Sequence, residues 1–342
     1  MTSNTAAWQV APKSKPFHIK PAPYTSPGAN EIVLKNAAWA INPIDWMQQE
    51  LAYFDIDYPN IIGEDVAGEV VEVGSAATNL FRPGDRALGY ALSLATNRPC
   101  DGAFQAYTVL KANMAARIPE SVPFDRAAVV PLCLSTAAAG MFQKGFLELK
   151  YPALDLNPKP TGETLLVWGG ASSVGSNAIQ LAVAAGYEVI TTASPKNFAY
   201  VKNLGASQAF DYNSASVVED LVAAFKNKTI AGVLDTVNRN GAIQHCADVL
   251  RRSQGKKVVS TVMQPPEKLP GGVAAKLVLA YTIKDDEVSH VIFNQFLPKA
   301  LAEGKFVPAP DPHVVGKGIE ALQAGLEVRK KGVSAQKVVV TV

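Results

Sequence analysis

The chain has 342 residues, of which 48% are hydrophobic and 18% charged, and this is more than one hydrophobic core usually organises. The 32 Lys and Arg residues against 30 Asp and Glu leave a net charge of +2, with no basic run to follow a nucleic acid. Apolar runs stay below the roughly 20 residues of a membrane span, and residues 1–15 lack the apolar core of a signal peptide. We therefore expect a two-domain cytoplasmic protein, monomeric or homodimeric, that binds neither nucleic acid nor membrane. Three widely spaced Cys residues indicate reduced thiols.

The first half of the chain, from Glu31 to about Pro119, alternates short apolar runs with turn signals such as Pro43, Gly74 and Pro83-Gly84. The runs predict strands at 31–37, 67–73, 86–90 and 105–109. This half is typical of a compact β-rich domain.

The second half has a different pattern, in which strands and helices alternate after a helix at 125–140 and a Pro-rich stretch at 151–160. The predicted strands are 164–168, 188–193, 208–212, 232–237 and 257–262, and the predicted helices are 173–185, 197–204, 216–225 and 243–250. Such alternation predicts a doubly wound parallel sheet. The tail contains a helix near 316–331 and a strand at 337–342 that could rejoin the first domain.

A glycine-rich loop, Gly169 to Gly175, joins the first strand of this alternation to its helix. Gly170 and Gly175 match the dinucleotide-binding template, whereas Ser172 replaces the middle glycine and offers a hydroxyl in exchange for a more crowded backbone. The N–H groups at the helix start suit phosphates. A turn that only packs the helix on the sheet is the alternative, and a serine-hydrolase elbow is disfavoured by Val174 at its last glycine position.

The end of the strand 188–193 indicates which nucleotide binds. No acid stands there to hold a ribose 2′-hydroxyl. Ser194, Lys196 and Asn197 instead offer a hydroxyl, a cation and an amide, which complement a 2′-phosphate, so we favour NADPH over NADH. An exposed first-turn lysine and a serine N-cap are a structural alternative that does not exclude this role.

Metal ligands are not grouped in the sequence. The four His residues are scattered and no C-x-x-C motif exists, so no zinc site is expected. His245 and Cys246 are adjacent, and we interpret them as a solvated or half-buried pair. An oxidoreductase without zinc lacks the Lewis acid that polarises a carbonyl, so its chemistry must suit hydride transfer alone.

Several motifs together resemble the medium-chain dehydrogenase/reductase superfamily over nearly the whole chain. They are Asn42-Pro43-Ile44-Asp45, the run 63–74, Arg82-Pro83-Gly84-Asp85-Arg86, Gly102-Ala103-Phe104 and the run 131–137. The runs 194–198 and 210–212 are similar to its zinc-free fungal members, the trans-enoyl reductases of polyketide synthesis and above all the CipB-like proteins.

The resemblance implies a GroES-like β-rich catalytic domain, residues 1–129 and 302–342, and a Rossmann NADPH-binding domain, residues 130–301. Where zinc members carry Gly-His-Glu this chain has Gly63-Glu64-Asp65, so the ligand histidine is absent. Cys133 lies near a third ligand position, and we interpret it as a small buried residue.

The resemblance also implies roles for particular residues, with alternatives for two of them. Asp45 and Ile44 would border the nicotinamide, Thr136 its ribose, and Tyr212 the adenosine. Residues Gly170, Ala171, Ser172, Ser173 and Val174 would hold the pyrophosphate, and Ser194, Lys196 and Asn197 the 2′-phosphate. Asp45 is equally interpretable as an acid capping a helix after Pro43, and Thr136 as an ordinary helix-start residue. Some polyketide enoyl reductases carry a lysine soon after the Asp45 position, and Trp46-Met47-Gln48 here disfavours an acyl-carrier substrate.

The expected activity is zinc-independent, NADPH-dependent reduction of a polarised C=C bond in an enone, enal or enoyl compound. Hydride goes to the β-carbon, and water, Tyr53 or Thr136 supplies the proton. The segments 48–60 and 263–280 are expected to shape a pocket for a small apolar electrophile. The alternatives are a quinone or carbonyl reductase and a catalytically idle NADPH-binding protein.

Overall fold

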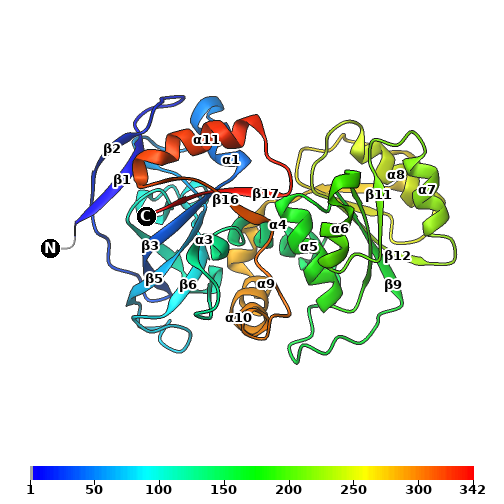
Figure 1. Ribbon diagram of the computed structural model, residues 1–342, viewed down its shortest axis with the longest axis horizontal. Helices are drawn as coiled ribbons and strands as arrows, with labels where there is room; N and C mark the ends of the chain where they lie inside the picture. Colours follow the sequence, from blue (N-terminus) through cyan, green and yellow to red (C-terminus); the bar gives the residue numbers. More distant parts are fainter. Residues whose placement is uncertain (1–2) are drawn as a thin grey trace. The chain divides into compact units, whose positions relative to one another are not determined.

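The computed structural model describes residues 3–342, and their contacts divide the chain into two compact units (Figure 1). The first unit combines the residues up to Leu132 with Phe293–Val342, and the second is Cys133–Ile292. Our prediction had placed these boundaries after residues 129 and 301. The chain returns to the first unit within a π-helical segment, η6 (His290–Phe296).

The first unit is built on a seven-stranded sheet of order β16-β17-β3-β5-β6-β8, with β7 paired beside β3. A smaller sheet has the order β2-β1-β4. The strands are β1 (Asn4–Gln9), β2 (His18–Ala22), β3 (Glu31–Ile41), β4 (Asn60–Ile61), β5 (Asp65–Val73), β6 (Arg86–Tyr90), β7 (Tyr107–Lys111), β8 (Ala115–Arg117), β16 (Asp311–Lys317) and β17 (Gln336–Thr341). The α-helices are α1 (Pro43–Leu51), α2 (Ser93–Thr96), α3 (Phe124–Ala127), α10 (Leu297–Ala302) and α11 (Leu322–Lys331).

Three of the four predicted strands of this unit are confirmed as β3, β5 and β6, and the fourth starts two residues late. The delay arises because Asn36 binds the backbone before β7: its amide donates to the carbonyls of Ala103 and Gln105 at 3.1 and 2.7 Å. The Ala103 carbonyl also accepts the Gln105 N–H, and Gln105 pairs with Ala6 of β1, so these residues form a turn and a bridge and do not join the β7 ladder.

The tail does rejoin the first unit, as the sequence allowed. β17 pairs antiparallel with β3, with Val339 opposite Ala40. The helix predicted near 316–331 is wrong only over residues 316–318, because β16 occupies 311–317, whereas the 3₁₀ turn η7 (Ile319–Ala321) leads directly into α11. Val314 pairs with Val339 of β17, and β-branched residues favour that strand over a helix.

The second unit is a parallel sheet of order β11-β10-β9-β12-β14-β15, with the short β13 beside β12. Its strands are β9 (Glu163–Trp168), β10 (Glu188–Ala193), β11 (Gln208–Asp211), β12 (Thr229–Asp235), β13 (Gln254–Gly255), β14 (Val258–Thr261) and β15 (Ala274–Leu277). Its α-helices include α4 (Pro131–Phe142), which begins at the boundary, α5 (Ser173–Ala184), α6 (Phe198–Asn203), α7 (Val217–Ala224), α8 (Ala242–Arg252) and α9 (Glu287–Ser289).

This order confirms the doubly wound sheet, because the chain runs outward from β9 on one side and from β12 on the other. Two details differ from the prediction. β15 was missed within an apolar run that carries no strand alternation. The helix predicted at 125–140 is broken into α3 and α4, because Pro131 lacks an N–H and disfavours a helical conformation at Val130.

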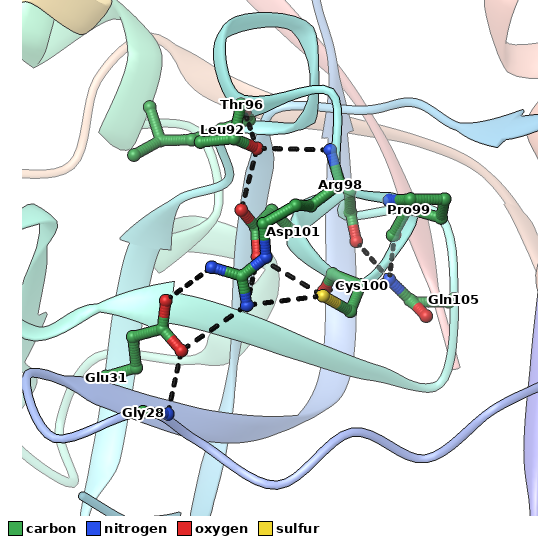
Figure 2. A network of polar contacts seen from close by, with 10 residues as sticks. Gly28, Glu31, Leu92, Thr96, Arg98, Pro99, Cys100, Asp101 and Gln105 are labelled. Carbon is green, nitrogen blue, oxygen red and sulfur yellow. Dashed lines mark hydrogen bonds and ion pairs between the residues drawn. The ribbon is translucent and has the colours of Figure 1, made fainter. Parts of the chain in front are cut away.

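A polar network fixes the loop between β6 and β7 (Figure 2). The Arg98 guanidinium binds the Glu31 carboxylate at 2.8 Å and approaches both Asp101 and the Cys100 sulfur at 3.5 Å. Gln105 donates to the Gly102 carbonyl at 2.7 Å. Burial raises the pKa of the Cys100 thiol. All three cysteines are free thiols, as the sequence predicted.

Candidate active site

The glycine-rich loop joins β9 to α5 at the point where the strand order of the second unit reverses. Two of its glycines are required by close packing. A Cβ atom at Gly170 would clash with the Thr191 hydroxyl, and one at Gly175 would clash with the Gly169 carbonyl oxygen. Doubly wound sheets bind their ligands at such a reversal, beyond the carboxyl ends of the strands.

Ser172 uses its hydroxyl within the protein. Its Oγ accepts the Gly175 N–H at 2.9 Å as the N-cap of α5 and lies 2.8 Å from the Thr236 hydroxyl at the end of β12. The sequence predicted that this hydroxyl would be available to a ligand. In the structure it accepts a backbone N–H at the start of the helix instead. Ala171, Ser172, Ser173 and Val174 are partly exposed, so the turn itself is accessible.

The strand ends β10 and β11 bring together the residues assigned to the 2′-phosphate and the adenosine. Ala193 and Asp211 are neighbours in the parallel ladder, so Ser194 and Tyr212 follow side by side, with 2.9 Å between their hydroxyl oxygens. Lys196 is exposed on the 3₁₀ turn η3 (Pro195–Asn197), where Asn197 is half-buried. Ser194 precedes this turn, but its side chain makes no capping hydrogen bond. The alternative that Ser194 acts as a serine N-cap is therefore not supported.

Asp45 is the third residue of α1 and is fully buried. Its Oδ2 accepts the Asn42 N–H at 2.7 Å, as in a capping box. The helix-capping interpretation of Asp45 is therefore confirmed, while its other oxygen, Oδ1, has no hydrogen-bond partner among residues 3–342. Burial raises the pKa of Asp45 to about 7.

Around Asp45 lies a buried cluster of charged side chains in the first unit. Lys337 on β17 contacts Asp65 on β5 at 2.8 Å, and the Asn42 amide donates to the same Asp65 oxygen at 2.8 Å. Glu64, which precedes β5, accepts a hydrogen bond from the Tyr90 hydroxyl. Burial, together with the charges of Asp45 and Asp65, raises the pKa of Glu64 well above its usual value.

The charges in this cluster do not balance if every group is ionised. Asp45, Glu64 and Asp65 would carry three negative charges against the single ammonium of Lys337, and all four are at most 4% exposed. Buried charges without partners are strongly disfavoured, so the cluster retains protons at neutral pH. Within the cluster, the Asp65 carboxylate has the most partners: it accepts from Asn42, Lys337 and the Leu132 N–H, the last at 2.6 Å.

The two proposed hydroxyl donors occupy different environments. Tyr53 follows α1 and is 50% exposed, with its ring edge-on to Phe54 at 5.3 Å. Phe54 is fixed by Gln48, which accepts its N–H at 2.7 Å. Thr136 is buried inside α4, in its second turn, so it is not the helix-start residue that we had considered. Ile44 is half-buried against the core of the first unit.

No three His, Cys, Asp or Glu side chains within residues 3–342 are grouped so as to hold a metal ion. The buried group formed by Asp45, Glu64, Asp65 and Lys337 is called the acid cluster below. Its cation is the Lys337 ammonium. His245 is half-buried beside the Trp168 ring, at 5.5 Å, and Cys246 is buried in the core. Cys133 is buried as expected.

Family models match both units of the chain. Residues 28–120 match the alcohol dehydrogenase GroES-like domain and residues 173–290 match the zinc-binding dehydrogenase domain. The dehydrogenase orf1 of Aspergillus niger is 48% identical over 100% of this chain and 99% of its own length. The zinc-binding alcohol dehydrogenase domain-containing protein cipB of Emericella nidulans is 49% identical over 99% and 98%.

The chain belongs to the medium-chain dehydrogenase/reductase superfamily. It is an oxidoreductase of the CipB-like branch, and membership in the superfamily implies a nicotinamide cofactor. The trans-enoyl reductase himH of Aspergillus japonicus is 40% identical over 99% of this chain and 97% of its own length. Among solved structures, the CurK enoyl reductase superposes with a TM-score of 0.75 at 19% identity over 98% and 99% of the two chains, which shows the shared fold.

The superfamily assignment confirms the sequence resemblance and the fold class, a GroES-like domain with a Rossmann domain. None of the helices in residues 3–342 is long and apolar enough to span a membrane. Sequence reasoning missed Tyr90 and Lys337 as members of a buried site. A lysine at the start of an otherwise apolar final strand was the available signal for Lys337.

Proposed function

We propose that this oxidoreductase uses NADPH to reduce a polarised C=C bond without zinc. The observation that carries the proposal is the 40% identity, over nearly the whole chain, to a protein named as a trans-enoyl reductase. The expected substrate is a small apolar enone, enal or enoyl compound, acted on in the cytoplasm by a monomer or homodimer. Neither nucleic acid nor membrane is expected as a partner.

The residues of the second unit fit a dinucleotide phosphate. The loop leaves no room for side chains at Gly170 and Gly175, and residues 171–174 at the helix start are partly exposed, which suits a pyrophosphate. At the ends of β10 and β11, Ser194, Tyr212 and the exposed Lys196 would hold the 2′-phosphate and the adenosine. When bound, the cofactor supplies the hydride.

The first unit supports chemistry without a Lewis acid. The Lys337 ammonium lies 2.8 Å from Asp65 within the buried carboxylate cluster, which supports a site that works without a metal ion. Conjugation delocalises the negative charge that develops on the substrate, so positioning alone accomplishes much of the catalysis. The proton for the α-carbon originates in solvent. Three side chains are candidates for passing this proton to the substrate. Tyr53 is exposed and exchanges its hydroxyl proton with water directly, whereas Thr136 is buried. Burial raises the pKa of Asp45 to about 7, so this carboxyl releases a proton near neutral pH.

The reaction is tested with NADPH deuterated at the transferred C4 position and a simple α,β-unsaturated ketone. We expect deuterium at the β-carbon, a solvent proton at the α-carbon, and poor turnover of saturated aldehydes. Deuterium on the carbonyl carbon would support a carbonyl reductase instead. Tight NADPH binding without turnover of any enone, quinone or aldehyde would support the idle binder.

The cofactor preference is tested separately through Lys196. Removing its charge-assisted contact should weaken NADPH binding by about 1.5 to 3 kcal/mol and leave NADH binding nearly unchanged. Lys202→Gln, which removes another exposed lysine from the end of α6, is the matched control. Equal losses for both nucleotides in Lys196→Gln would contradict the preference for NADPH.

A further inference from the structure

A cleft of about 510 Å³ lies within the first unit and is lined by residues from three segments. Asp85 and Arg86 come from the start of β6, Arg117 from the end of β8, and Asn294 and Lys299 from the helical segment 290–302. The cleft shares no residue with the glycine loop or with the acid cluster.

The charges on this cleft are mostly positive. Arg86, Arg117 and Lys299 contribute three cations, and Asp85 contributes the carboxylate. The Asp85 side chain already accepts the Arg82 N–H at 3.0 Å and lies 3.4 Å from the Arg82 Nε. Its charge is therefore directed at Arg82, and the two lining arginines keep a net attraction for an anion.

Two guanidinium groups line the cleft. Arg86 donates from Nη2 to the Val122 carbonyl at 2.7 Å and stacks 4.0 Å from the Phe124 ring centre, which fixes its plane. Its Nε is buried and has no partner among residues 3–342. Arg117 is exposed, and its side chain makes no hydrogen bond or ion pair within the same residues. Planar guanidinium forks bind the oxygens of phosphate and carboxylate in pairs.

The wall opposite the strands is held in place. The Asn294 amide donates to the carbonyls of Ala112 and Ala115 at 3.1 and 2.9 Å, which ties the helical segment to β8. Asn294 belongs to the π-helical stretch η6, and π-helical turns occur frequently at functional sites. A cleft that is already formed loses little entropy when it binds a ligand.

We infer that this cleft binds a small molecule through a phosphate group carrying two or more negative charges, with Arg86, Arg117 and Lys299 as its contacts. The volume exceeds that of one phosphate and lies in the range of small-ligand sites, so an organic or second phosphate moiety accompanies the anion. The lining also includes Ile118, Pro119, Pro298 and Ala302, whose apolar side chains can contact that organic moiety. The inference does not depend on the proposed reaction.

Pyrophosphate is the probe, and arginine side-chain NMR of the full chain with ¹⁵N-labelled Nε reports on individual sites. The Arg117 signal is assigned as the one that is missing from the spectrum of the Arg117→Gln variant. In the unsubstituted protein this signal should shift saturably as pyrophosphate is added. Arg126 serves as an internal control because it is paired with Asp311 at 2.9 Å in the same unit. Succinate as a second titrant distinguishes phosphate recognition from binding of any dianion.

Calorimetry with the same probe then compares two variants. Arg117→Gln should weaken pyrophosphate binding at least tenfold, and Lys196→Gln should leave the cleft component of the binding unchanged. An exposed arginine can be replaced without loss of the fold, and unchanged thermal unfolding verifies this. The inference is wrong if the Arg117 signal does not respond to pyrophosphate, if succinate binds equally well, or if only Lys196→Gln weakens binding. The last result would place the anion at the cofactor loop.

Discussion

Replacing Asp45 with asparagine should stabilise the first unit at alkaline pH, although it removes a helix-capping carboxylate. In the folded protein, burial raises the pKa of Asp45 to about 7 from 3.8. The unfolded chain releases this proton near pH 4, so between pH 4 and 7 the folded state binds more protons and its stability falls as pH rises. Asparagine keeps an oxygen that can accept the Asn42 N–H, which the carboxylate accepts at 2.7 Å.

The size of the effect follows from the shift of about three pKa units, each worth about 1.4 kcal/mol. Relative to the wild type, Asp45→Asn should be nearly neutral at pH 4 and more stable by roughly 4 kcal/mol at pH 8. Because Asp45 is fully buried, solvent does not screen this stability difference. Ionised Asp45 would also repel Asp65, and the substitution removes that repulsion.

Urea unfolding from pH 5 to 8 measures the difference. Trp8, Trp39 and Trp46 lie in the first unit and Trp168 in the second, so a Trp168→Phe background confines the fluorescence signal to the first unit. Asp55→Asn is the control, because Asp55 is an exposed acid in the same unit. A stability difference between Asp45→Asn and wild type that does not change with pH would refute the reasoning.

Three further outcomes are expected. Lys337→Met should destabilise the first unit by about 3 to 5 kcal/mol, because it leaves the Asp65 carboxylate buried without its ion-pair partner, and adding Asp65→Asn should recover part of the loss in urea unfolding. Ser172→Ala should cost the second unit about 1 kcal/mol through the lost α5 cap, whereas Ser216→Ala, at an N-cap without a capping bond, should cost less. Elemental analysis should find no stoichiometric zinc and chelators should not change activity; zinc that survives dialysis and is needed for turnover would overturn the proposed mechanism.

Local patterns in the sequence predicted the main strands and helices of the second unit and some strands of the first. β10 and β6 have the predicted bounds, and the loop from Gly169 to Gly175 was found because strand, turn and helix signals are contiguous there. β16 was missed because its only partner in the sheet is β17, and helix propensity in the following residues dominated the local pattern.

The acid cluster was not predictable in the same way. Asn42 and Lys337, which contact one another in it, are 295 residues apart, so no spacing within the chain places them together. The sequence singled out Asp45 and Glu64 by their place in motifs, and burial is what determines their protonation. A pattern read along the chain carries no information about desolvation, which is the main cause of both pKa shifts.

The pairing of β17 with β3 has a consequence for how the protein is made. The second unit uses only residues 133–292, so it can fold as soon as that stretch has left the ribosome. The central sheet of the first unit must wait, because β3 lacks β17 beside it until residues 336–341 are synthesised. During that interval residues 38–41 of β3 lack this partner strand, although β7 already pairs with residues 31–35, and the acids at positions 45, 64 and 65 have no ammonium among them. Slow synthesis of the last fifty residues therefore prolongs an aggregation-prone state of the first unit, while faster translation there shortens it.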